Sequence, residues 1–265
     1  MKEKQFYFSF NDYVQLFEDI TGCKIKPERN LVKKRLERFF KKCQIKSDNI
    51  FAVEHLIRTD KECFNSFIDI FIPVESYFFR EQDYLNLAIE IAEKQNFKEI
   101  LVAPCATGET AYSLKILANE KNLNSIKIEG IDISESAIDQ AEKGIFNEHS
   151  VKNLPNKYLQ KYFFKTEKGF KVLHPLKENI EFLTSNLLTL RKINKYDIII
   201  CRNFLIYLKE DTVKVVLNII YQSLKNCGVL ILGKSELSLI KCFPYFKREE
   251  INNLLIFRKK TCQNS

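Results

Sequence analysis

The chain of 265 residues carries 42 Lys and Arg against 34 Asp and Glu, a formal net charge of +8 at pH 7. With 45% hydrophobic and 29% charged residues, the composition excludes a disordered protein and is typical of a globular one. The charge excess is local, because residues 24–46 hold ten basic and two acidic side chains and the rest of the chain is balanced. A nucleic-acid coat or a basic tail would spread the charge or place it at a terminus, so both are disfavoured.

Signals for a membrane span, secretion or a metal site are absent from the sequence. No stretch approaches about 18 uninterrupted apolar residues, and the N-terminal MKEKQFYFSF lacks the apolar core of a secretion signal. The eight cysteines form no C-x-x-C pair, and several lie inside apolar runs, as reduced cysteines do. We therefore expect a reduced, cytoplasmic protein with no metal ion and no membrane insertion.

Residues 1–73 are predicted to form a helical N-terminal domain, in which the segment 30–43 has two contrasting faces. At about 100° per residue, its apolar side chains share one side of a helix; they are Val32, Leu36, Phe39, Phe40 and Cys43. The opposite side, here called the basic ridge, carries Lys34, Arg35, Arg38, Lys41 and Lys42. The apolar stripe is expected to dock the helix, and the ridge is either a partner surface or an ordinary solvated face.

Residues 74–265 are predicted to form an α/β domain, because short apolar strands alternate with amphipathic helices. Expected strands lie at 99–105, 125–131, 180–184, 196–201, 228–233 and 254–258. Expected helices end near 95, 119, 143 and 224. The stretch 145–180 interrupts this alternation and is predicted to form a small insertion, with a helix over 154–164 and a flap of two or three antiparallel strands. The pattern therefore predicts a Rossmann-like, mostly parallel sheet with helices on both faces.

Candidate ligand-binding residues follow the first two expected strands. The loop A-T-G-E at 106–109 has one glycine, which suits a pyrophosphate poorly, and Glu109 would attract an ammonium group. A capping role for Glu109 is an equal alternative. Asp132 stands 24 residues after Gly108, a spacing at which a carboxylate can bind ribose hydroxyls. The alternative is that Asp132 or Ser134 caps the next helix, and the two roles are compatible.

Polar side chains also follow two later strands. Asn186 comes after EFLTS, and Arg202 and Asn203 come after YDIIIC. Carboxyl ends of parallel strands meet at one edge of a sheet, so these residues should gather near Asp132. An amide there can read the edge of an adenine. Together the strand-end residues predict a cofactor that contains a nucleoside.

Seven motifs of the chain resemble, in order and spacing, those of the chemotaxis receptor methyltransferases, the CheR family. They are SYFFRE (76–81), ATGETAYS (106–113), GIDISESAIDQAEKGIF (130–146), LPNKYLQKYF (154–163), IEFLTSNLL (180–188), DIIICRNFLIYL (197–208) and GVLILGKSE (228–236). The resemblance implies a helical N-terminal domain, a methyltransferase domain and a small β insertion. It also implies transfer of methyl groups from S-adenosylmethionine to glutamates of chemoreceptors, with S-adenosylhomocysteine as product.

The resemblance assigns roles to individual residues. Arg80 matches an arginine near the methyl donor, and Tyr207 a tyrosine near the substrate carboxylate; both are expected to be catalytic. The matched cofactor-binding positions are Ser76, Arg80, Gly108, Glu109, Asp132, Asn186, Leu187, Arg202 and Asn203. Of these, Glu109 is implied to hold the methionine ammonium and Asp132 the ribose, and Asn186 and Leu187 are implied to contact adenine.

The chain departs from the family pattern at three points. Val74 stands where the family usually has Asn, Thr110 replaces a second Glu, and Lys234 replaces a His. These departures keep open an alternative, in which the chain is a non-catalytic docking protein on a methyltransferase fold. A base-modifying methyltransferase is disfavoured, because CRNFLIYL stands where an N-P-P-Y or D-P-P-Y element would be.

The reaction that the resemblance implies needs no general base. A glutamate titrates near pH ~4.3, so the nucleophile is already ionised at pH 7. Alignment is then the main task of the enzyme, with Arg80 and Tyr207 orienting the two carboxylate oxygens. The expected partner is the cytoplasmic helix of a methyl-accepting chemoreceptor, which the basic ridge would dock. We expect a monomer that binds no nucleic acid.

Overall fold

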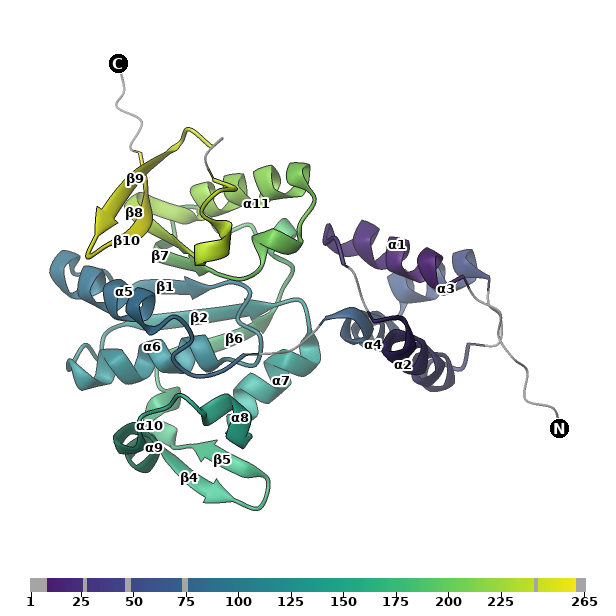
Figure 1. Ribbon diagram of the computed structural model, residues 1–265, viewed down its shortest axis with the longest axis horizontal. Coiled ribbons are helices and arrows are strands. Elements are labelled where there is room, and N and C mark those ends of the chain that lie inside the picture. Colours follow the sequence, from purple (N-terminus) through teal and green to yellow (C-terminus); the bar gives the residue numbers. More distant parts are fainter. Residues whose placement is uncertain (1–8, 26–27, 46–48, 73–75, 241–242, 261–265) are drawn as a thin grey trace. The chain divides into compact units, whose positions relative to one another are not determined.

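The computed structural model describes residues 9–25, 28–45, 49–72, 76–240 and 243–260. The chain divides at position 73 into two compact units, and Tyr207–Lys209 group with the first. Leu208 forms an antiparallel bridge with Cys23, and Lys209 N donates to Gly22 O at 3.2 Å, which accounts for this grouping. Figure 1 shows both units.

The described part of the first unit is helical, as predicted. It contains α1 (Phe10–Thr21), α2 (Arg29–Lys42), α3 (Ile50–Thr59) and α4 (Lys61–Phe71). Helix α2 confirms the expected periodicity, because Val32, Leu36, Phe39 and Phe40 are all at most 3% exposed. Aromatic rings fill much of the core; Phe39 lies 5.7 Å from Phe67, centroid to centroid. The apolar stripe therefore packs inward and turns the basic ridge outward.

The second unit is built on a seven-stranded sheet, with the order β6-β2-β1-β7-β8-β10-β9. The strands are β1 (Glu99–Val102), β2 (Lys127–Asp132), β6 (Ile180–Thr184), β7 (Tyr196–Cys201), β8 (Leu224–Leu232), β9 (Phe246–Ile251) and β10 (Leu254–Lys259). Pairing is parallel except where β10 meets β8 and β9. This confirms the predicted Rossmann-like, mostly parallel sheet.

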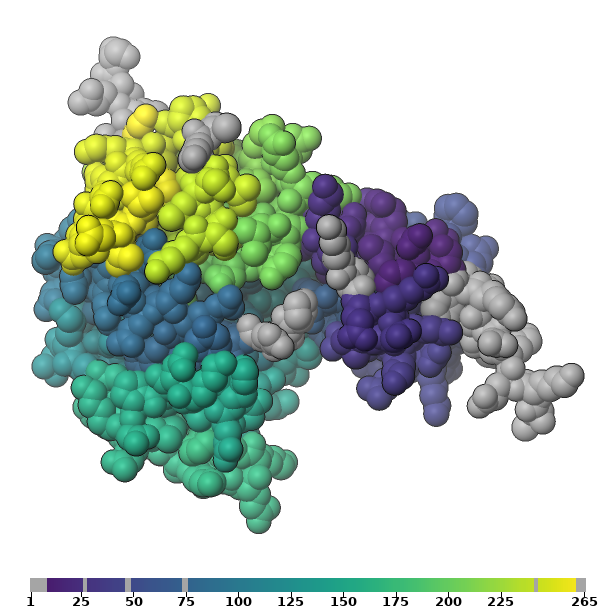
Figure 2. Space-filling model, in the orientation of Figure 1, coloured from purple at the N-terminus to yellow at the C-terminus, as the bar shows by residue number. Residues whose placement is uncertain are grey.

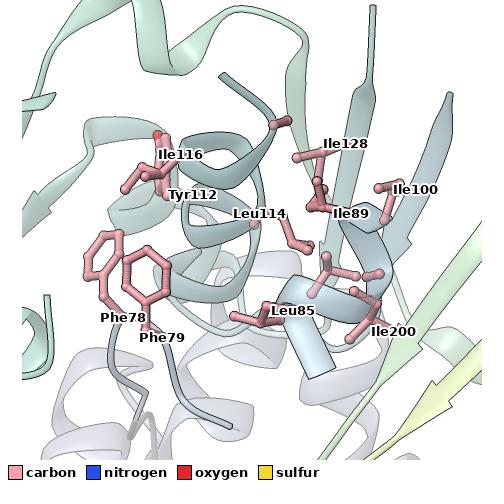
Figure 3. Packing of buried hydrophobic residues seen from close by; sticks show 14 of the residues in the cluster. Phe78, Phe79, Leu85, Ile89, Ile100, Tyr112, Leu114, Ile116, Ile128 and Ile200 are labelled. Atoms are coloured by element: carbon pink, nitrogen blue, oxygen red, sulfur yellow. The ribbon is translucent and has the colours of Figure 1, made fainter. Parts of the chain in front are cut away.

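Helices cover both faces of this sheet, which explains why β1, β2 and β7 are buried along almost their whole length. They are α5 (Gln82–Gln95), α6 (Glu109–Glu120), α7 (Glu135–Lys143) and α11 (Glu210–Ser223). One buried cluster joins α5 and α6 to alternate strand residues such as Ile100, Ile198 and Ile200. Figure 3 shows Phe78 and Phe79 among the residues of this core. The intervening Leu101 and Ile199 are also fully buried and face the other side.

The predicted insertion is present as a separate three-stranded antiparallel sheet, with the order β3-β5-β4. It contains β3 (Ile145–Phe146), α8 (Glu148–Val151), α9 (Asn156–Tyr162), β4 (Phe163–Thr166), β5 (Gly169–Val172) and α10 (His174–Lys177). The hairpin of β4 and β5 extends from the body of the second unit (Figures 1 and 2). Phe78 fastens the insertion, because its ring makes edge contacts with Phe146 at 4.8 Å and Phe163 at 5.2 Å.

The secondary structure differs from expectation in the insertion, at the edge of the sheet and in strand bounds, since β1 already ends at Val102 and β8 already begins at Leu224. The helix expected over 154–164 stops at Tyr162, since Phe163 begins β4 and pairs with Val172. Strand β9 was not expected at all. Its sequence FKREEI is mostly charged, and only Phe246 is buried, as suits a strand at the edge of a sheet.

Candidate functional site

The sheet reverses its strand order between β1 and β7, so ligands of such a fold bind beyond the carboxyl ends of these strands. The loops after β1, β2, β6 and β7 all lie at this edge. Asp132 connects two of them: its Oδ2 accepts from Ala106 N at 2.9 Å and its Oδ1 from Ser134 N at 3.0 Å. Ser134 is the N-cap of α7, because its Oγ accepts from Ala137 N at 3.2 Å.

Asn186 lies next to Asp132, since Ser185 N donates to Asp132 O at 2.8 Å. The amide oxygen of Asn186 accepts from Leu188 N at 2.9 Å and so caps a short 3-10 helix, Leu187–Thr189. Leu187 itself is 6% exposed. The structure therefore groups Asp132, Asn186 and Leu187 at one place, as the strand-end argument expects, and their contacts with a nucleoside stay a prediction.

Gly108 occupies a position that only glycine fits easily. Its φ of +92° is left-handed, and it is the N-cap of α6. A Cβ built there would lie 2.9 Å from Cβ of Ala141 and 3.0 Å from Cζ of Phe182. The chain thus turns from β1 into α6 in very little space, which places Glu109 at the first turn of the helix.

Glu109 is a buried carboxylate surrounded by hydroxyl groups. It is 1% exposed; its Oε2 accepts from Thr107 Oγ1 at 2.7 Å and its Oε1 from Ser150 Oγ at 3.1 Å, with a further side-chain hydrogen bond to Ser76. Burial raises the pKa of Glu109, and these hydrogen bonds oppose that shift. Among the described residues no lysine or arginine forms an ion pair with it. The site therefore offers a desolvated negative charge that a cationic group on a ligand would stabilise.

Arg80 lies in a tight turn just before α5. The residues on either side of it, Phe79 and Glu81, both have left-handed backbone, with φ of 58° and 51°. The Arg80 side chain is half-buried, and its guanidinium lies 5.8 Å from the centroid of the Tyr77 ring. Strained backbone of this kind is concentrated at functional sites.

Arg202 contacts this turn rather than pointing away from the protein. Its Nη1 donates to Arg80 O at 2.9 Å and forms an ion pair with Glu81 Oε2 at 3.3 Å. Burial lowers the pKa of Arg202 to about 10. Its buried Nε has no hydrogen-bond partner within the part of the chain that the structure describes. The sequence placed Arg202 near the cofactor, and the structure brings it beside Arg80.

Glu236 binds the backbone of the segment that contains Asn203. The sequence alone did not identify Glu236 as a residue of the site. It is fully buried, and its carboxylate accepts from the backbone N–H groups of four residues, at 2.7–2.8 Å; they are Asn203, Phe204, Leu205 and Gly233. Burial raises the pKa of Glu236 against the effect of these bonds. The available signal was the G-K-S-E sequence after β8, in which only the exposed Lys234 drew notice.

Three hydroxyl residues at the site were also missed. Thr107 and Ser150 bind the Glu109 carboxylate, and Ser113 accepts from Phe79 N at 3.0 Å. Ser150 comes from the insertion and lies 41 positions from Glu109 in sequence. Ser150 and Ser113 meet partners far away in the sequence and carry no pattern that one sequence reveals, whereas Thr107 stands two positions before Glu109 in the motif ATGETAYS, which Ser113 ends.

The remaining predicted residues belong to the first unit or are not described. Tyr207 is 46% exposed and groups with the first unit, so it is not placed relative to Arg80. In the basic ridge, Lys34, Arg38, Lys41 and Lys42 are exposed, and Arg35 is half-buried. Arg35 Nη1 donates to Ile70 O at 2.8 Å, and Lys42 Nζ donates to Ser66 Oγ at 2.8 Å. Val74 lies outside the described residues.

Within the described ranges, no group of His, Cys, Asp or Glu side chains is suited to a metal ion. The described cysteines are all free. None of the helices in those ranges has the length and apolar character to cross a membrane.

Comparisons with known proteins bear on the second unit above all. A family model described as CheR methyltransferase, SAM binding domain, matches residues 74–250. The chain is 34% identical over 203 residues to chemotaxis protein methyltransferase 2 of Vibrio cholerae, covering 71% of this chain and 68% of that protein. It is 25% identical over 242 residues to a chemotaxis protein methyltransferase of Campylobacter jejuni, covering 90% and 91%. The chain is also 34% identical over 188 residues to a chemotaxis protein methyltransferase of Borreliella burgdorferi, covering 64% of this chain and 66% of that protein.

Proposed function

Because the chain belongs to the CheR methyltransferase family, and so carries an S-adenosylmethionine-binding domain, we propose that it methylates glutamate side chains of chemoreceptors. The product is a glutamyl methyl ester. The observation that carries the proposal in this chain is the Glu109 carboxylate, which is 1% exposed and has no cationic partner among the described residues. An enzyme that binds a positively charged methyl donor needs such a group.

The residues at the strand ends have side chains of the types that the parts of S-adenosylmethionine would bind. Glu109 would hold the ammonium of the methionine part, and the hydroxyls of Thr107 and Ser150 keep its carboxylate in place. Asp132 would bind the ribose hydroxyls, because a carboxylate oxygen that accepts one N–H can accept a further donor. Asn186 and Leu187 would contact the adenine.

Bound S-adenosylmethionine supplies a methyl group on a positively charged sulfur. With it bound, an oxygen of the substrate carboxylate would form the bond to the methyl carbon as the carbon–sulfur bond breaks, giving a neutral ester and S-adenosylhomocysteine. No proton moves, since the substrate is already ionised at pH 7. The protein contributes alignment of the reacting atoms, and Arg80 supplies donors that can hold one carboxylate oxygen.

The basic ridge supports an acidic protein helix as the partner. Lys34, Arg38 and Lys41 are exposed on one side of α2. Within the described residues their side chains form no hydrogen bond or ion pair, whereas Lys42 is paired with Glu62 at 3.3 Å. Exposed charges of one sign attract an oppositely charged surface and set its direction of approach. The enzyme is proposed to act in the cytoplasm, as a monomer, on the cytoplasmic helices of the receptor.

Incubation with labelled S-adenosylmethionine and native receptor membranes tests the proposal. We expect label that base releases as a volatile methyl product, since esters hydrolyse in base and methylated amines do not. Glu109→Gln should lose labelling together with affinity for S-adenosylhomocysteine. A wild-type protein that binds no S-adenosylhomocysteine would instead be a non-catalytic docking protein, which is the alternative function.

A further inference from the structure

We infer that Ser113 is a positioning residue for Arg80, acting through the backbone of the turn that presents the guanidinium. This inference rests on the proposed function and adds a residue to it. Ser113 lies one helical turn after Glu109 on α6 and is completely buried. Its hydroxyl joins the backbone of Glu109, a proposed donor-site residue, to the backbone of Phe79, the residue before Arg80.

The Ser113 hydroxyl takes part in two consecutive hydrogen bonds. Phe79 N donates to Ser113 Oγ at 3.0 Å, and Ser113 Oγ donates to Glu109 O at 2.6 Å. A buried helical serine commonly bonds the carbonyl four residues before it, so the second bond alone would mean little. The first bond spans 34 positions of sequence and ends on the residue next to Arg80. That contact is what gives the hydroxyl a role beyond its own helix.

Phe79 needs this acceptor. It is 4% exposed, so water does not easily reach its N–H, and a buried N–H without a partner is costly. Its φ of 58° is unfavourable for an aromatic residue, and surrounding contacts must hold it. The Phe79 ring is fixed by stacking on Tyr158, with ring centroids 5.7 Å apart. Ser113 provides the matching constraint on the backbone.

The turn is thus fixed on both sides of Arg80. On the N-terminal side, Phe78 N donates to Ser150 O at 2.8 Å, and Phe79 N donates to Ser113. On the C-terminal side, Arg202 binds the carbonyl of Arg80 and the carboxylate of Glu81. The Arg80 guanidinium lies against the Tyr77 ring and forms no hydrogen bond or ion pair with the described residues, so the backbone of the turn carries most of the constraint on it. Precise placement of the backbone then decides where the guanidinium points.

A double-mutant cycle on methyl transfer tests the inference. The variants are Ser113→Ala, Arg80→Ala and the double variant, measured at saturating S-adenosylmethionine together with the dissociation constant of S-adenosylhomocysteine. We expect Ser113→Ala to lower kcat about tenfold, as loss of alignment does, with the dissociation constant changed less than about threefold. In the Arg80→Ala background it should cause no further loss. Ser113→Thr, which keeps the hydroxyl, should restore transfer.

Two controls separate positioning from stability. Ser223→Ala removes another buried helical hydroxyl, in α11, and is expected to leave kcat unchanged. Ser113→Cys keeps the shape of the side chain but replaces the hydroxyl by a thiol, which is a weaker hydrogen-bond acceptor. It therefore gives the same comparison if the alanine variant does not fold. Equal kcat for Ser113→Ala and wild type, or equal losses in both backgrounds, overturns the inference alone. A wild-type enzyme that transfers no methyl group overturns the proposed function and the inference with it.

Discussion

The guanidinium of Arg202 and the backbone carbonyl of Arg80 are joined by a hydrogen bond of 2.9 Å across 122 positions of sequence. The contact links the loop after β7 to the turn before α5, so the switch point of the sheet and the proposed catalytic arginine are fixed to one another. Arg202 therefore acts on the site through backbone geometry, in addition to the cofactor contact that the sequence suggests.

Arg202→Ala should damage both stability and transfer. The side chain is 6% exposed and pairs with Glu81, and breaking such a buried pair costs about 3–5 kcal/mol. We expect the free energy of unfolding, measured in urea, to fall by an amount near the lower end of that range. Arg202→Lys should recover charge but not the fork of donors, so kcat should remain well below that of wild type. Full activity of the lysine variant would contradict the positioning role.

Glu109→Gln is expected to stabilise the ligand-free protein at neutral pH while it weakens donor binding. Burial raises the pKa of Glu109 above its ordinary value of 4.5, so the folded state binds this proton more tightly than the unfolded chain does. The favourable contribution of the acid form is complete below about pH 4.5 and is lost as pH rises through the folded-state pKa. Hydroxyl groups can accept as well as donate, so Thr107 and Ser150 can adapt to the amide.

Urea unfolding of wild type and Glu109→Gln without ligand, at pH 5 and pH 8, checks this expectation. The variant's advantage in free energy of unfolding should be larger at pH 8. Affinity for S-adenosylhomocysteine, measured by calorimetry at pH 8, should be lower in the variant. A difference in stability that does not depend on pH would mean that the charge of Glu109 is not the cause.

Asp132→Ala and Ser134→Ala separate ligand binding from helix capping. Asp132 binds two backbone N–H groups and, by proposal, the ribose, so its alanine variant should raise the dissociation constant of S-adenosylhomocysteine at least about tenfold. Ser134 is the cap of α7, and its alanine variant should cost about 1 kcal/mol of stability with little change in affinity. If calorimetry finds an unchanged constant for Asp132→Ala, the residue does not belong to the donor site.

Glu236→Gln tests whether the buried carboxylate shapes the loop after β7. The amide keeps one oxygen and turns an NH₂ group toward N–H donors, so about two of the four hydrogen bonds are lost. We expect a loss of about 2–3 kcal/mol in the free energy of unfolding and weaker binding of S-adenosylhomocysteine. The same change at the exposed Glu250 should alter neither quantity.

Charge reversal on the basic ridge should affect the receptor and not the donor. Arg38→Glu combined with Lys41→Glu is expected to reduce receptor methylation and to flatten its dependence on salt, because screening acts over about 8–10 Å. These two residues are better choices than Lys42, which is held by Glu62 and Ser66. Lys94→Glu with Lys192→Glu, exposed in the second unit, gives a control of equal charge. Equal loss in both double variants would refute docking by the ridge.

The parts of the fold that one sequence predicts well are those in which local pattern and burial agree. The run at 196–201 becomes β7 with the expected bounds and is buried throughout, because a parallel strand covered on both faces is mostly apolar. The run at 180–184 becomes β6 with the expected bounds although it lies at the edge of the sheet and only its Phe182 is buried. Edge strand β9 has one buried residue and no such run. Phe163 continues a helical pattern but pairs with β5, so tertiary contact overrides local preference there.

The residues of the candidate site also differ in how well the sequence predicts them. Asp132 and Asn186 could be proposed from their positions at strand ends, because topology alone brings those ends together. Ser150, Ser113 and Glu236 act through hydrogen bonds to backbone or side chains more than 30 positions away. Their residue types are common at caps and on surfaces, so only the packed structure distinguishes them.

The insertion and the turn at Arg80 are held by the same contacts, those of Phe78 and Ser150. Phe78 packs between Phe146 and Phe163, and Ser150 of α8 contacts both Phe78 and Glu109. A chimera that exchanged residues 144–177 for those of a relative would therefore replace part of the proposed donor site, including Ser150, as well as the projecting hairpin. Domain grafts meant to retarget this enzyme should keep α8 and the Phe146 and Phe163 positions from the recipient, and exchange only the tip between β4 and β5.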